Sequence, residues 1–168
     1  MALVATAGGG TSNSYVTQAT ANTYFADGNH AKANIWQALA DSQKDQYLIM
    51  ATRHIDMQPI RGGKYDTTTT SGIPDQRLKF PRGADYDGGI FIPLPVSDAT
   101  YEQAVYLAEH EDSTELRANL QRAGVSSANL SGVAAETYRG AQGQLLCATA
   151  YQILLDAGLI MTSAGFSC

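Results

Sequence analysis

Residues 41–56 read DSQKDQYLIMATRHID, and this stretch of sequence decides the fold. Its apolar residues recur at positions i, i+1, i+4 and i+8, the spacing that places side chains on one face of an α-helix. They are Tyr47, Leu48, Ala51 and Ile55. A polar residue suited to begin a helix, Asp41 or Ser42, precedes them. The stretch therefore predicts an amphipathic helix that buries one face in a hydrophobic core.

Three other segments predict helices that can pack against this face. The first begins with Thr17 as N-cap and ends near Asp27-Gly28, and the second spans about 97–111. The last spans about 141–157 and is apolar on most sides. It is therefore either the central core helix or a helix buried in an interface. Trp36, just ahead of the stretch quoted above, is expected to fold back over its buried face as a lid.

The segments between these helices complete the expected organisation. Residues 1–16 predict an extended N-terminal arm, and residues 61–95 are rich in glycine and proline and predict a long loop. Residues 125–138 alternate loosely, as in a β-hairpin or β-arm, and residues 159–168 form an apolar tail. We therefore expect one mainly α domain over residues 1–168: a small bundle of about four helices with a long central loop and a short β-hairpin or β-arm.

Charge is scarce and unevenly distributed along the chain. Of 168 residues, 44% are hydrophobic and 16% charged, whereas globular proteins average about 25% charged residues. Residues 1–84 hold 8 Lys/Arg and 6 Asp/Glu, and residues 85–168 hold 3 and 10. The net charge of −5 argues against a free-standing duplex-DNA binder, which normally carries a basic excess.

Motifs for catalysis, metal binding or membrane insertion are missing from the sequence. His30, His54 and His110 lie in separate segments without a second ligand at metal-binding spacing. Cys147 and Cys168 fit neither a zinc site nor a disulfide framework. No nucleophile elbow occurs, and no apolar run approaches the ~18 residues of a membrane span. We expect a protein that is not an enzyme, binds no metal or cofactor and does not enter a membrane.

One segment gathers basic and aromatic side chains. Its cations and rings are Arg61, Lys64, Tyr65, Arg77, Lys79, Phe80 and Arg82. In a loop, such a mixture can grip single-stranded nucleic acid, because bases stack on rings while cations contact phosphates. Alternatively, the segment is a basic subunit-interface loop that forms salt bridges with an acidic neighbouring subunit. The acidic second half of the chain favours this second interpretation.

Short motifs follow one another in a fixed order over about residues 11–140. They include Asn13-Ser14-Tyr15-Val16, Tyr24-Phe25, Trp36, Leu48-Ile49-Met50-Ala51-Thr52, Ile55-Asp56, Arg61-Gly62, Gln76-Arg77-Leu78-Lys79-Phe80-Pro81-Arg82 and Leu120-Gln121-Arg122-Ala123-Gly124-Val125. The series resembles the head–tail connector (adaptor, head-completion) proteins of tailed bacteriophages. Part of that group carries the label DnaT-like single-stranded DNA-binding protein.

The resemblance implies a virion protein of the neck, assembled in the host cytoplasm. Such a subunit forms a twelve-fold ring under the portal, extends the DNA channel and offers a platform to the tail. Its partners are other copies of itself, the portal protein, tail or tail-completion proteins and genomic DNA, which passes without sequence-specific binding. The apolar tail then provides portal-docking residues: Leu159, Ile160, Met161 and Phe166. The alternative is a single-stranded DNA-binding accessory protein that uses the loop 61–82.

Overall fold

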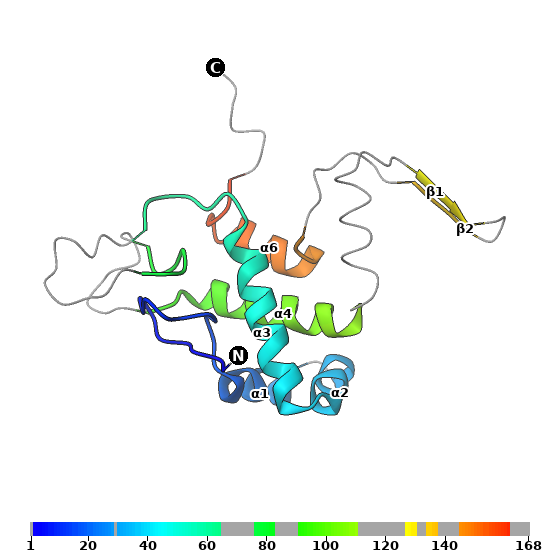
Figure 1. Ribbon diagram of the computed structural model, residues 1–168. Helices are drawn as coiled ribbons and strands as arrows, with labels where there is room; N and C mark the ends of the chain where they lie inside the picture. Colours follow the sequence, from blue (N-terminus) through cyan, green and yellow to red (C-terminus); the bar gives the residue numbers. More distant parts are fainter. Residues whose placement is uncertain are drawn as a thin grey trace, which may run out of the picture.

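Helix α3 (Asp41–Asp56) crosses α4 (Leu94–Glu109), and the other helices pack around this crossing (Figure 1). The computed structural model describes residues 2–28, 30–64, 76–82, 91–110, 127–130, 134–137 and 145–161. The described helices besides these two are α1 (Gln18–Asp27), α2 (His30–Ala38) and α6 (Ala148–Asp156). Strands β1 (Ser127–Leu130) and β2 (Ala134–Thr137) pair antiparallel. The prediction of a mainly helical bundle with a short β-hairpin is confirmed.

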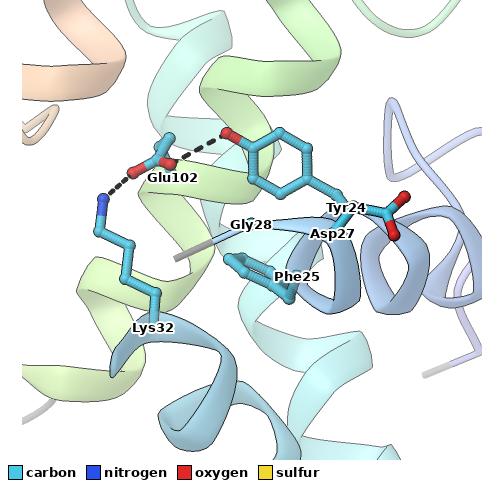
Figure 2. A pocket seen from close by; sticks show the side chains of 6 residues that line it. All are labelled: Tyr24, Phe25, Asp27, Gly28, Lys32 and Glu102. Atoms are coloured by element: carbon cyan, nitrogen blue, oxygen red, sulfur yellow. Dashed lines mark hydrogen bonds and ion pairs between the residues drawn. The ribbon is translucent and has the colours of Figure 1, made fainter. Parts of the chain in front are cut away.

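Helix α1 begins where the sequence predicts. The Thr17 hydroxyl accepts a hydrogen bond from the Thr20 backbone N–H at 3.2 Å, and the Thr20 hydroxyl accepts one from the Thr17 N–H at 3.2 Å. This reciprocal capping satisfies two N–H groups that would otherwise lack a partner at the helix start. Near the end of α1, the Tyr24 hydroxyl donates to Glu102 of α4 at 3.0 Å, which ties the two helices together (Figure 2).

Helix α2 is an element that the sequence pattern did not predict. Trp36 was expected in a lid over α3, but it lies in this helix and is 1% exposed. Its ring packs against that of Phe25 with centroids 5.0 Å apart, and its indole N–H donates to Asn22 at 2.8 Å. Burial of so large a side chain with its polar N–H satisfied explains why this short helix docks firmly on α1.

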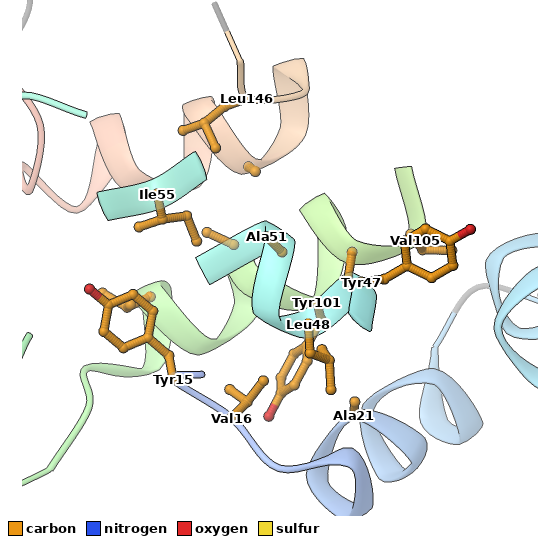
Figure 3. Packing of buried hydrophobic residues seen from close by; sticks show 14 of the residues in the cluster. Tyr15, Val16, Ala21, Tyr47, Leu48, Ala51, Ile55, Tyr101, Val105 and Leu146 are labelled. Carbon is orange, nitrogen blue, oxygen red and sulfur yellow. The ribbon is translucent and has the colours of Figure 1, made fainter. Parts of the chain in front are cut away.

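The buried face predicted for α3 is confirmed. Tyr47, Leu48, Ala51 and Ile55 are all buried, and they pack with residues of α4 such as Val105 (Figure 3). Leu48, Ala51 and Ile55 have no exposed surface at all. Full burial of a Leu or Ile side chain stabilises a fold by about 1.5–3 kcal/mol, so this one face supplies a large part of the folding free energy.

Two helix boundaries differ from the prediction. Helix α4 begins at Leu94 instead of near residue 97, because Pro95 fits the first turn, where a helix needs no backbone N–H. Helix α6 begins at Ala148 instead of near residue 141. Cys147 is extended there (φ −61°, ψ 155°), and its Sγ accepts a hydrogen bond from the Ala150 N–H at 3.4 Å. Residues 141–144 lie outside the described part of the chain.

A buried glutamine joins the three central helices. Gln103 of α4 has no exposed surface, and its Oε1 accepts a hydrogen bond from the Cys147 N–H at 2.7 Å. Its Nε2 donates to the Leu145 carbonyl at 3.1 Å and lies 3.2 Å from His54 Nδ1 of α3. These bonds satisfy backbone groups just before α6, where the chain is not helical and would otherwise leave them unpaired.

The first and the last described residues both fold back onto the rest of the protein. Residues 2–16 turn back at Gly8 (φ +69°), and the Val4 carbonyl accepts from the Asn13 N–H at 2.9 Å. After α6, Ile160 pairs antiparallel with Ile60 and is 2% exposed. The division of the chain into a single domain with an N-terminal arm, the loop 61–95 and the tail 159–168 stays a prediction, although α4 takes the last residues of that loop.

Candidate nucleic-acid interface

Arg82 fastens two irregular segments, residues 60–64 and 76–82, to each other. Lys64 and Arg82 form an antiparallel β-bridge. The Arg82 guanidinium donates from Nε to the Arg61 carbonyl at 2.9 Å and from Nη2 to the Ile60 carbonyl at 3.0 Å, and it also contacts the Gly62 carbonyl. A guanidinium carries five N–H donors in a fixed fork, so one side chain can satisfy several converging carbonyls.

A glycine makes this convergence possible. Gly62 has φ +77°, a left-handed conformation that other residues adopt only with strain. The turn at this position directs the carbonyls of Ile60, Arg61 and Gly62 toward Arg82. In the motif Arg61-Gly62, the glycine is therefore needed for the conformation of the turn.

Two of the residues predicted for the interface, Phe80 and Arg82, are buried. Phe80 is 1% exposed, and its ring meets that of Tyr15 edge-on with centroids 5.7 Å apart. Arg82 is 7% exposed, and its guanidinium carbon lies 5.9 Å from the centre of the Phe80 ring. Neither side chain can contact a base or a phosphate, because core packing and backbone carbonyls already enclose both.

The other described cations of this region face solvent. Arg61, Lys64 and Arg77 are exposed and Lys79 is half-buried. Among the described residues, none of these four lies within ion-pair distance of a carboxylate. We call these four residues the basic face. Tyr65, the remaining residue of the predicted set, lies outside the described part of the chain.

Backbone contacts hold two of the basic side chains in place. Lys64 Nζ donates to the carbonyls of Gln76 and Arg77 at 3.3 and 3.2 Å. Lys79 Nζ donates to the Gln58 carbonyl at 2.7 Å. Carbonyl contacts position each ammonium without neutralising it, so the part of its charge that Asp56 does not offset can attract an anion.

Asp56, at the end of α3, anchors the basic face to the bundle. Its carboxylate accepts a hydrogen bond from the Tyr15 hydroxyl and accepts the Lys79 backbone N–H at 3.3 Å from each oxygen. Burial raises the pKa of this carboxyl, while the hydrogen bonds from Tyr15 and Lys79 and the charges of Lys79 and Lys64 oppose that rise. Burial and the charge of Asp56 likewise raise the pKa of Tyr15.

Gln76 holds residues 76–82 in a compact turn through hydrogen bonds from its side chain. It is 9% exposed, and its Nε2 donates to the Leu78 carbonyl at 2.7 Å and to the Pro81 carbonyl at 2.9 Å. The sequence analysis did not single out Tyr15, Asp56 or Gln76 as site residues. All three stand in the ordered motif series, so that series is the signal that could have identified them.

The predicted docking residues are divided between surface and core. Met161 is 45% exposed and Leu159 is half-buried. Ile160 was expected to dock onto a partner, but it is 2% exposed and packs against the protein's own core beside Ile60. Phe166 lies outside the described residues.

The described residues offer neither a metal site nor a membrane-spanning helix. Within the described part of the chain, no group of three or more His, Cys, Asp or Glu side chains could hold a metal ion. None of its helices combines the length and the apolar character that crossing a membrane requires.

Comparison with known proteins identifies the family. A sequence model matches residues 1–166, and its family is described as "Putative DnaT-like ssDNA binding protein". Neither a curated protein nor a solved structure matches the chain. Because the match spans nearly the whole chain, the protein belongs to this family.

Proposed function

We propose that the protein binds single-stranded DNA through the basic face. The observation that carries the proposal is the display of four cations on two segments that Arg82 fastens side by side: Arg61, Lys64, Arg77 and Lys79. The family description supports the same activity. The proposed function requires no catalysis, cofactor or metal ion.

The chemistry of the basic face favours contacts with phosphates. Phe80 is enclosed in the core, so it adds no ring on which a base could stack. Phosphate contacts by Lys and Arg depend little on sequence and release counterions, which makes the affinity fall as salt rises. Binding through the four cations should therefore be weak at physiological salt, strong at low salt and indifferent to base sequence.

Fluorescence anisotropy with a labelled oligothymidine tests this proposal. For single strands, the logarithm of the affinity falls with the logarithm of salt concentration by about 0.7 per phosphate contacted. Wild-type protein should therefore show a slope of roughly −3 for four contacts. Arg77→Gln or Lys64→Gln should each reduce the magnitude of the slope by about 0.7.

Lys44→Gln is the matched control for these variants. Lys44 lies on α3 twelve residues before Asp56, which is about 18 Å along the helix axis. Its removal should leave the slope unchanged. Affinity that does not respond to salt, or an equal change of slope in Lys44→Gln, would refute binding through the basic face.

A second candidate function is a subunit of a phage head–tail adaptor ring. The separation of charge favours it, because the basic face lies at one part of the surface while Asp27 and Asp98 lie near the contact of α1 with α4. A ring repeats one heterologous contact, which requires complementary patches at different places on the subunit. Such a ring would lie in the virion neck, between portal and tail proteins.

Mass photometry distinguishes the adaptor from a DNA-binding accessory protein. The adaptor predicts closed rings of about twelve copies with purified portal protein, and Arg77→Gln should weaken their assembly. A protein that stays monomeric with and without portal would rule out the adaptor and would leave single-strand binding unaffected.

A further inference from the structure

A pocket of about 310 Å³ lies away from the basic face, where α1 ends, α2 begins and α4 passes by (Figure 2). We call it the α1–α4 pocket. Its lining residues are Tyr24, Phe25, Asp27, Gly28, Lys32 and Glu102. Ligand pockets usually measure roughly 300–1,000 Å³, so this one suits a group of side-chain size and is too small for a nucleotide.

Glu102 is the central polar group of the pocket. It lies in the middle of α4, is 8% exposed, and accepts a hydrogen bond from the Tyr24 hydroxyl at 3.0 Å. Its second oxygen contacts the ammonium of Lys32, which reaches across from α2 (Figure 2). A carboxylate so deeply buried needs a positive partner, since an unpaired buried charge is strongly destabilising.

Two further carboxylates lie near Glu102 in the described part of the chain. Asp27 lines the pocket together with Glu102, and Asp98 lies one helical turn before Glu102 on α4. Burial and the charge of Glu102 raise the pKa of the Asp98 carboxyl, and burial and the same charge raise the pKa of Tyr24. The negative charge of Glu102 therefore favours one positive group in this pocket, which either Lys32 or a ligand can supply.

We propose that the α1–α4 pocket binds a guanidinium group on an apolar stem, the chemistry of an arginine side chain or of a small arginine derivative. A guanidinium matches a carboxylate through two parallel hydrogen bonds and stacks on aromatic rings, which an ammonium does less well. Glu102 presents the carboxylate, and the rings of Tyr24 and Phe25 form apolar walls beside it.

Lys32 occupies the position that the positive charge of the ligand would take. Its side chain is 34% exposed and hangs on a flexible stem, so it can leave Glu102 for solvent without moving α2. An incoming guanidinium then takes its place. Lys32 therefore competes with the ligand, and removing its charge should strengthen ligand binding.

The test titrates N-acetyl-L-arginine amide into the isotopically labelled full chain and follows amide chemical shifts by NMR. The shifts should be confined to the end of α1, the start of α2 and the middle of α4. N-acetyl-L-lysine amide should bind at least about fivefold more weakly, because it lacks the planar fork. A short arginine-containing peptide distinguishes the sources: tighter binding than the amide assigns the pocket to a protein partner, and equal binding assigns it to a small arginine derivative.

Variants make the test decisive. Lys32→Met should bind the arginine amide at least about fivefold more tightly, whereas Glu102→Gln should lose binding. Tyr24→Phe should retain the fold and weaken binding of the arginine amide. This variant tests the pocket even if Glu102→Gln is too unstable to measure. Lys44→Met removes a lysine outside the pocket and should change nothing. Weaker binding by Lys32→Met, or equal binding of the lysine and arginine amides, would overturn the proposal.

The outcome is independent of the proposed single-strand binding. Arg77→Gln should bind the arginine amide like wild type although its salt-dependent DNA affinity is reduced. A loss of arginine binding in this variant would mean that the arginine amide binds at the basic face, and it would contradict the proposal.

Discussion

The helical bundle and the basic face are held together in different ways. In α3, α4 and α6 the backbone satisfies its own hydrogen bonds, and side chains such as Leu48 and Leu154 supply only apolar surface. In residues 60–64 and 76–82 side chains must satisfy the backbone, and Arg82 and Gln76 do so. Basic and polar residues in an irregular segment are therefore often needed to hold its conformation.

This difference separates the basic and aromatic residues of the loop 61–82 into two groups that the sequence does not distinguish. Phe80 and Arg82 stand among the cations and rings of the loop, yet they are 1% and 7% exposed. Arg61, Lys64 and Arg77 are exposed on the same two segments. The buried pair shapes the segments, and the exposed residues carry the charge that a ligand would meet.

The largest loss of stability is expected from a substitution in the helical bundle. Trp36→Ala removes a ring packed on Phe25 and leaves a large cavity between α1 and α2, so it should lower the free energy of unfolding by about 3–5 kcal/mol. Urea denaturation followed by circular dichroism measures this loss. Trp36→Phe, which keeps a ring, should lose much less. A loss below about 1 kcal/mol in Trp36→Ala would show that α2 is not part of the core.

A smaller and more local effect is expected in the basic face. Arg82→Met leaves the carbonyls of Ile60, Arg61 and Gly62 without their donor, at a cost of roughly 1–3 kcal/mol. Although Arg82 is buried, this variant should reduce DNA affinity more than Arg77→Met does, because it releases both segments. Arg82→Lys should not rescue it, since an ammonium lacks the guanidinium fork. Anisotropy and urea denaturation of the three variants decide the point, and an Arg82→Met protein that behaves like wild type would contradict it.

The smallest effect is a dependence of stability on pH at the junction of the two regions. Burial raises the pKa of Asp56 above its ordinary value of 3.8, so the folded protein holds this proton more tightly than the unfolded chain does. The carboxyl therefore contributes its full stabilisation below 3.8, and this is lost as pH rises through the folded pKa. Each tenfold difference in proton affinity between the folded and unfolded chain corresponds to about 1.4 kcal/mol of stability.

Asp56→Asn removes that titration and keeps an oxygen acceptor for Tyr15. Between about pH 3.5 and about pH 7, wild type should lose stability relative to this variant as pH rises. Urea midpoints over this range measure the difference, with Asp41→Asn, an exposed carboxylate of the same helix, as control. A difference that grows in the opposite direction would mean that the hydrogen bonds of Asp56 outweigh its burial.

Local signals in the sequence were sufficient for part of the fold. Thr17 capped α1 as predicted, and the apolar spacing of α3 identified its buried face. Helix α2 was missed because HAKANIWQA has no continuous apolar stripe, and its stability comes from Trp36 packing on Phe25. Tertiary contacts of this kind cannot be read from the periodicity of nine residues.

The candidate site was harder to predict than the fold. The sequence identified the segment and its cations, but it could not reveal that Gly62 turns three carbonyls toward Arg82. It also could not place Glu102 opposite Lys32, which is 70 residues away in the chain. Both facts depend on how distant segments meet, and side-chain type alone does not determine that.

The glutamine at the centre of the bundle has a consequence for how this protein can vary. The chain leaves α4 at residue 110 and returns at residue 145 to Gln103, which bonds both Leu145 and Cys147. Position 103 can therefore vary little, because a residue that lacks either an amide N–H or an amide oxygen leaves a backbone group just before α6 without its partner. The placement of α6 against α4 depends on this one side chain.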